Sequence, residues 1–139
     1  MTVDTIATPL DRTSLPELRF LGGLAGFPQA ERFALVEVEG SLLFVLKSLD
    51  HQGLEFVVAP PSVFFPGYVA EIDEGDVERL ALQTADDALL LVVLTLRETV
   101  AQATANLQAP VVINQRTKQA AQVVLSRGGH SLRQALPAV

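Results

Sequence analysis

The sequence predicts a mainly β fold, namely a small closed or partly closed antiparallel β-barrel or roll with one short helix. About six short apolar segments of strand length alternate with turn residues. Only residues 73–80 have the pattern of a helix, so the long helices that connect parallel strands are missing. The composition is 49% apolar and 19% charged. A closed sheet hides the edges that so apolar a chain would otherwise expose to water.

A length of 139 residues suits one domain, whose core needs neither a disulfide nor a metal ion. We expect residues 1–16 to form a loose tail and residues 17–136 to form the domain. The tail lacks the basic start and apolar run of a signal peptide, and no later run reaches the roughly 20 apolar residues of a membrane helix. A cytoplasmic protein with no membrane partner is therefore expected. The absence of cysteine excludes disulfides and thiolate zinc sites.

The first three strands follow from short apolar runs and the turns between them. Residues 33–38 and 42–48 are predicted to form a hairpin, because the loop that joins them, residues 39–41, contains a glycine. Residues 55–58 are predicted to be a third strand, since residues 50–53 before them are typical of a turn.

A proline pair at residues 60–61 then ends the ladder, because proline has no backbone N–H to donate. The helix predicted at residues 73–80 begins with Asp73 as its N-cap and has further acids in its first turn, which suits the helix dipole. Val77 and Leu80 are three residues apart, so both are expected to face the core.

The second half of the chain contains the longest apolar run and a second hairpin pattern. Residues 88–95 do not alternate, so they are predicted to be a strand buried on both faces or a core strand of a closed sheet. Residues 111–114 and 121–125 flank a polar stretch and are predicted to form the last hairpin.

The charge is distributed unevenly along the chain. The net charge is −6, but residues 1–98 carry −10 and residues 99–139 carry +4, with no acid in the second part. An acidic protein repels the phosphate backbone, so direct nucleic-acid binding is not expected and a basic protein partner is favoured. The alternative is that the charge only keeps the domain soluble.

No pattern typical of catalysis, cofactor binding or metal binding appears. His51 and His130 are isolated in polar segments, which favours surface histidines over metal ligands. The acids at 86–87 fit a turn better than a catalytic pair. The glycines within residues 22–26 indicate a backbone turn rather than a phosphate-binding loop. We therefore expect no catalytic residue, cofactor or metal ion.

Two groups of residues remain as candidate interaction sites. Phe64, Phe65 and Tyr68 either plug one end of the barrel or form a recognition patch, since aromatic side chains anchor protein interfaces. Asn106 and Asn114 are either amides satisfied within a turn or bulge, or contacts to a partner.

Several short motifs occur in a specific order and spacing along the chain. They are GFP at 26–28, RF at 32–33, LxSLD at 46–50, FVV at 56–58 with Pro60, FFPxY at 64–68, DVERL at 76–80, TxNLxAPVVIN at 104–114 and QVVL at 122–125. This order resembles that of the flagellar assembly factor FliW family, over roughly residues 20–136. Departures from the family pattern include Ala59, where an acid is common, and Ala81, where a glycine usually follows the helix.

The resemblance implies a barrel-like protein that is a monomer when free and has two kinds of protein partner. One is flagellin, bound near its C-terminal helical end, and the other is the RNA-binding translational repressor CsrA. In the switch that the resemblance implies, flagellin holds the factor until its export frees the factor to bind the repressor. Such a switch requires only that the two complexes exclude each other.

Candidate surfaces for both partners follow from the resemblance. An apolar groove suits the amphipathic end of flagellin, and the loop at residues 64–68 is the candidate wall. The candidate surface for the basic repressor consists of five acids, which would also repel RNA. They are Glu71, Asp73, Glu74, Asp76 and Glu78. The alternatives are a small β-roll enzyme and a structural subunit of a larger assembly.

Overall fold

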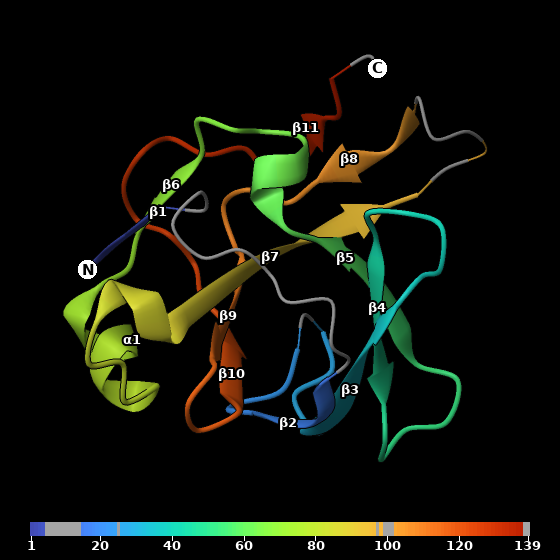
Figure 1. Ribbon diagram of the computed structural model, residues 1–139, viewed down its shortest axis with the longest axis horizontal. Helices are drawn as coiled ribbons and strands as arrows, with labels where there is room; N and C mark the ends of the chain where they lie inside the picture. The colour runs from blue at the N-terminus through green and yellow to red at the C-terminus, as the bar shows by residue number, and fades with distance from the viewer. Residues whose placement is uncertain (5–14, 25, 97, 99–101, 138–139) are drawn as a thin grey trace.

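Seven strands close into a barrel in the computed structural model, which describes residues 1–4, 15–24, 26–96, 98 and 102–137 (Figure 1). Neighbouring strands of the barrel are antiparallel, except β2 and β10, which run parallel. In order around the barrel, the strands are β7 (Ala88–Thr95), β5 (Glu55–Ala59), β4 (Phe44–Ser48), β3 (Arg32–Glu37), β2 (Leu15–Phe20), β10 (Gln119–Gln122) and β9 (Val111–Asn114), which returns to β7. The predicted fold class is confirmed.

The predicted first hairpin is confirmed as β3 and β4, paired in register from Phe33 opposite Ser48 to Glu37 opposite Phe44. Its turn is longer than expected and spans residues 38–43. The Val38 N–H donates to the Leu43 carbonyl at 3.0 Å, so the chain reverses before the second strand begins.

Large apolar side chains from alternate strand positions fill the barrel. Phe33 and Leu35 on β3 point inward and are fully buried, whereas Arg32 on the same strand is exposed. The rings of Phe20 and Phe33 meet edge to face at 4.9 Å. This inner core also contains Leu18, Leu46, Val58, Leu89, Leu91, Val111 and Ile113.

A second core lies on the outer face of the barrel. It is covered by a layer consisting of β1 (Thr2–Asp4), η1 (Pro61–Val63), β6 (Val69–Glu71) and α1 (Glu74–Arg79). Leu89 and Leu91 belong to the inner core, whereas Leu90 and Val92 belong to the second. Because successive strand residues point to opposite faces, β7 is buried on both sides, and its unbroken apolar run is explained.

The remaining short elements lie outside the barrel ring. They are η2 (Ala85–Asp87), β8 (Thr104–Ala105), which pairs with β7, and β11 (Gln134–Ala135), which pairs with β8. The last hairpin is confirmed as β9 and β10, although β10 begins two residues before the predicted strand. Residues 123–125 leave the ladder but keep backbone hydrogen bonds, since the Val123 N–H donates to the Pro110 carbonyl at 2.9 Å and the Leu125 N–H to the Gln108 carbonyl at 2.8 Å.

The N-terminal segment differs from the expected loose tail. Residues 2–4 form β1 and pair antiparallel with β6, because Val3 is buried in the second core. Residues 15–16 already belong to β2. Residues 5–14, the rest of the expected tail, lie outside the described residues.

Candidate protein-interaction surfaces

The aromatic loop at residues 64–68 packs into the second core rather than the barrel interior. Tyr68 is 5% exposed, and its O–H donates to the Leu107 carbonyl at 2.7 Å. Burial raises the pKa of the Tyr68 phenol. Phe64 and Phe65 are half-buried against the same core, with ring centroids 6.5 Å apart. Tyr68 therefore holds the covering layer in place, and of the three aromatic side chains only Phe64 and Phe65 keep surface that a partner can touch.

The histidines differ in their surroundings. His51 is exposed in the turn between β4 and β5, as predicted. His130 is half-buried instead, and its ring lies 4.9 Å from that of Tyr68. The prediction that His130 is a surface histidine was wrong, because the C-terminal segment folds back over the second core.

Three of the five predicted acids contact neighbouring polar groups, namely Glu71, Asp73 and Asp76. The Thr2 hydroxyl donates to Glu71 and, with the nearby Met1 amino group and Arg127, lowers the pKa of the Glu71 carboxyl. The Ser126 hydroxyl donates to Asp73 at 3.2 Å. The remaining exposed acids on α1 are Glu74 and Glu78.

The helix itself is confirmed, with Asp73 at the cap position. The Asp73 side chain makes no cap hydrogen bond to the helix backbone, so the predicted capping contact is wrong. Asp76 pairs with Arg79 at 2.9 Å on the same helix, which neutralises part of the acidic surface. Leu80 is fully buried and Val77 packs partly buried against the second core, as expected.

Asn114 is a satisfied structural amide. Its side chain is 0% exposed, and its Nδ2 donates to the carbonyls of Leu80 at 2.8 Å and Ala81 at 3.2 Å. Its Oδ1 accepts from the backbone N–H groups of Arg116 at 2.9 Å and Thr117 at 3.2 Å. The residue thus ties the end of α1 to the β9–β10 turn, and in this conformation its side chain is out of reach of a partner.

Asn106 has a similar local role between β8 and β9. Its Oδ1 accepts from the Ala109 N–H at 3.0 Å, and its own N–H donates to the Val93 carbonyl at 3.0 Å. Because the side chain is half-buried, it keeps some surface, and its role in partner binding stays a prediction.

The glycine-rich segment is a tight backbone turn, as predicted. A Cβ on Gly23 would lie 2.3 Å from the Phe27 carbonyl oxygen, and its φ of +74° favours glycine. This turn presents Phe27, which is 44% exposed and meets Phe56 edge to face with ring centroids 5.9 Å apart. A shallow depression of about 280 Å³ lies beside it and is lined by residues 26–30 and His51.

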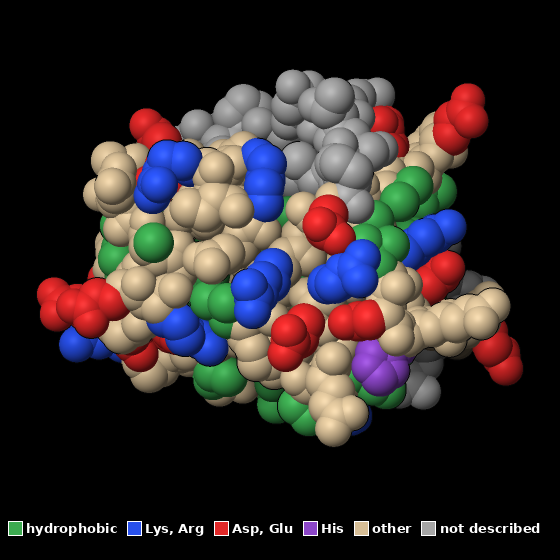
Figure 2. Space-filling model, turned by 90° about the horizontal axis from the view of Figure 1, so that it is seen from below, with side chains coloured by type: hydrophobic (Ala, Val, Ile, Leu, Met, Phe, Trp, Pro, Cys, Tyr) green, Lys and Arg blue, Asp and Glu red, His purple; other side chains and the backbone are tan. Residues whose placement is uncertain are grey.

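On the face seen from below, the charge asymmetry of the sequence does not become two separate surfaces. Figure 2 shows Lys and Arg side chains interspersed with acids over the face seen from below. Because β10 pairs with β2, Lys118 from the basic part of the chain lies in one depression with Glu17 and Glu31 from the acidic part. Arg32 donates to Glu17 at 3.0 Å in the same place.

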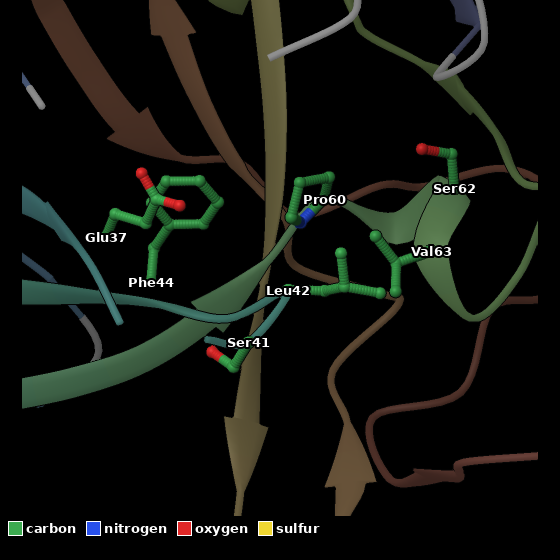
Figure 3. A pocket seen from close by; sticks show the side chains of 7 residues that line it. All are labelled: Glu37, Ser41, Leu42, Phe44, Pro60, Ser62 and Val63. Atoms are coloured by element: carbon green, nitrogen blue, oxygen red, sulfur yellow. The ribbon is translucent and has the colours of Figure 1, made fainter. Parts of the chain in front are cut away.

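A groove between the β3–β4 turn and η1 was missed by the sequence analysis (Figure 3). Its volume is about 200 Å³. The only local signal for it is the apolar pair at residues 42–43 inside a turn, which our prediction placed in the strand. The lining residues are Glu37, Ser41, Leu42, Phe44, Pro60, Ser62 and Val63.

Two other features are absent from the described residues. None of their helices has both the length and the apolar character required to cross a membrane. Among the same residues, no three His, Cys, Asp or Glu side chains are grouped closely enough to hold a metal ion.

The chain matches the family model described as FliW protein over residues 4–136. It is 39% identical over 114 residues to the flagellar assembly factor FliW of Anoxybacillus flavithermus, covering 82% of this chain and 79% of that protein. It is 38% identical over 116 residues to that of Bacillus licheniformis, covering 83% and 81%. A crystal structure of the flagellar assembly factor FliW superposes with a TM-score of 0.83 at 31% identity, covering 88% of this chain and 87% of the other. The chain belongs to the FliW family of flagellar assembly factors.

Proposed function

We propose that this chain acts in the cytoplasm by binding flagellin near its C-terminal end and by antagonising the repressor CsrA through protein–protein binding, with no catalysis. The observation that carries this proposal is the match to flagellar assembly factors in both sequence and fold over nearly the whole chain. The consequence is that flagellin translation is coupled to flagellar assembly.

The outer surface of the barrel supports a binding role, because it offers two regions of different chemistry. One is the acidic surface of β6 and α1, defined by Glu71, Asp73, Glu74, Asp76 and Glu78. The other is the apolar groove beside η1. An acidic surface attracts a basic partner, and an apolar groove suits an amphipathic helix.

The switch needs a negative coupling between the two partners. If flagellin and the repressor exclude each other, free flagellin lowers the apparent affinity for the repressor by mass action, and the repressor lowers that for flagellin by the same factor. The acidic surface would add repulsion of RNA only where its acids come within about 8 Å of the RNA path, the Debye length at physiological salt.

Neutralising the exposed acids of α1 tests the role of the acidic surface. We expect Glu74→Gln with Glu78→Gln to slow association with CsrA and weaken its binding most at low salt, because rim charges act mainly on encounter. These two positions are chosen because Glu71, Asp73 and Asp76 already hold Thr2, Ser126 and Arg79, so their loss would confound the result. Calorimetry and stopped-flow mixing at two salt concentrations measure the effect.

The matched control neutralises two exposed acids that lie outside α1, Glu31→Gln with Glu39→Gln, which removes the same net charge. This control should retain most of the association rate. Equal rates for the parent protein and the α1 variant at low salt would contradict the acidic-surface assignment. A parent protein that binds neither flagellin nor CsrA would contradict the proposed function as a whole.

A further inference from the structure

We propose that the C-terminal loop, residues 126–129, is an intramolecular competitor for the basic partner, because it lies on the acidic surface of β6 and α1 and contacts Asp73 beside Glu71. This inference rests on the proposed function and concerns how binding at that acidic surface is regulated. A basic partner gains full access to the two acids only when the loop releases them.

The C-terminal loop comes from the part of the chain that carries no acid. Residues 99–139 contain four basic residues, and Arg127 is the one within the loop. All sixteen acids lie in residues 1–98. The fold therefore places a segment with the charge of a basic partner onto an acidic surface of the same chain.

Two interactions connect the C-terminal loop with the acidic surface. The Ser126 hydroxyl lies within hydrogen-bond distance of both carboxylate oxygens of Asp73, at 3.3 Å and 3.2 Å. The charge of Arg127 contributes, after the Thr2 hydroxyl, to the lowered pKa of the Glu71 carboxyl. Figure 1 shows the chain after β10 passing beside β6, so the loop lies on the side of the molecule where these acids are.

The C-terminal loop is held at both ends and exposed in between. At one end Leu125 is 4% exposed, and its N–H donates to the Gln108 carbonyl at 2.8 Å. At the other end the Ser131 carbonyl accepts from the Leu107 N–H at 2.9 Å. All four residues at 126–129 are exposed, so few buried contacts oppose their displacement.

Two consecutive glycines allow the C-terminal loop to change conformation. Gly128 and Gly129 have φ values of +94° and +61°, and glycine moves between such conformations and ordinary ones at little cost. His130 follows them and packs its ring 4.9 Å from that of Tyr68. The segment that can lift therefore ends before His130, and the second core stays covered when the loop moves.

Charge determines that the loop opposes a basic partner rather than assisting it. The partner and Arg127 are attracted by the same carboxylates, and like charges placed side by side weaken association. Ser126 also uses hydrogen-bonding capacity of Asp73 while the loop is in place. Weakening the loop contacts should therefore strengthen repressor binding, whereas removing a side chain that contacts the partner would weaken it.

The first experiment compares Arg127→Gln with the matched control Arg133→Gln. Both arginines are exposed and each change removes one positive charge, but of the two only Arg127 acts on the Glu71 carboxyl. Calorimetry at low salt measures the affinity for CsrA, and thermal unfolding verifies that both variants fold. We expect R127Q to bind CsrA about two- to threefold more tightly than R133Q, with a smaller difference at high salt.

A second variant, Ser126→Ala, tests the loop contact without a change in net charge, so long-range attraction of a basic partner cannot explain a gain. We expect S126A to bind CsrA about twofold more tightly than the parent protein. The gain should vanish when S126A is combined with Asp73→Asn, because both changes then act on the same contact.

Each comparison can overturn the inference while the proposed function stays intact. Equal CsrA affinities of R127Q and R133Q would do so, and so would an S126A affinity at or below the parent value. A gain from S126A that persists in the D73N background would exclude Asp73 as the contested group and overturn it too. If the parent protein bound no CsrA, the proposed repressor binding itself would fail.

Discussion

Two buried polar side chains connect the covering layer to the barrel. Asn114 uses both ends of its amide to link the last carbonyls of α1 with the β9–β10 turn. Tyr68 uses its hydroxyl to reach Leu107, 39 residues away in the chain. Burying either group without its partners would be costly. Their presence in otherwise apolar surroundings therefore signals structural contacts, and a sequence pattern alone cannot distinguish these from binding residues.

The alkaline stability of the protein should depend on Tyr68. Burial raises its pKa above the ordinary value of 10.0. Below pH 10 both the folded and the unfolded chain keep the proton, so the stabilising effect is complete. Above pH 10 only the unfolded chain releases it readily, so stability falls as pH rises toward the folded pKa.

Absorbance of the phenolate measures the deprotonation of Tyr68 directly, because the chain has one tyrosine and no tryptophan. We expect the phenolate signal to appear only as the β signal in circular dichroism is lost. Tyr68→Phe should cost about 1 kcal/mol at neutral pH through the lost hydrogen bond, and should remove this part of the alkaline decline. A phenolate midpoint near 10 in the folded protein would contradict the expectation.

At the scale of the elements, α1 is a short helix that depends on its ends. It has six residues, none of them fully buried, and Leu80 just after it anchors it in the second core. Ala81 follows with a φ of +55°, in the left-handed region that favours glycine. Its carbonyl accepts from Asn114 and from the Arg116 guanidinium at 2.8 Å, so the strained conformation is held from the barrel side.

Ala81→Gly should stabilise the protein. Glycine adopts the left-handed conformation without the steric strain that alanine has there. Part of this gain is offset by the greater freedom of the unfolded chain, so the net stabilisation is about 0.5–1 kcal/mol. The denaturant midpoint at unchanged slope measures it. Ala34→Gly, in the extended strand β3, is the control and should be destabilising. A lower midpoint for A81G would show that the alanine conformation carries no strain.

The elements that sequence patterns identified are those whose signal is local. Residues 88–95 form a long apolar run, and residues 33–48 combine two apolar runs with a glycine turn, so both were predicted. The strands β1, β6, β8 and β11 have only two or three residues each, too few for periodicity to appear. They exist because of their pairing partners: β1 pairs with the distant β6, and β8 pairs with both β7 and β11.

At the scale of the whole molecule, closure of the barrel removes the sheet edges that lead to association. The ring closes through the β7–β9 pairing and the parallel β2–β10 pairing. Outside the ring, β11 has two residues and β1 has three, and both are too short to template another chain. A closed body of this kind suits the expected role as a monomer that pairs with partners through its outer surface.

We therefore expect a free monomer of 14.9 kDa by size-exclusion chromatography with light scattering at micromolar concentration. Adding flagellin should shift the peak to the mass of a complex. A concentration-independent dimer of the free chain would contradict this expectation and favour the alternative of a structural subunit.

The sequence by itself determined the mainly β class, the first and last hairpins, the doubly buried strand and the acids gathered around α1, because each depends on neighbouring residues. Only the tertiary structure decided how the ring closes, where Asn114 and Tyr68 find their partners, and where the groove lies. The groove combines the turn at 38–43 with η1, and the register that places Phe44 opposite Val58 brings the two together. Pairing between distant segments is set by the packing of the whole chain, and no local pattern records it.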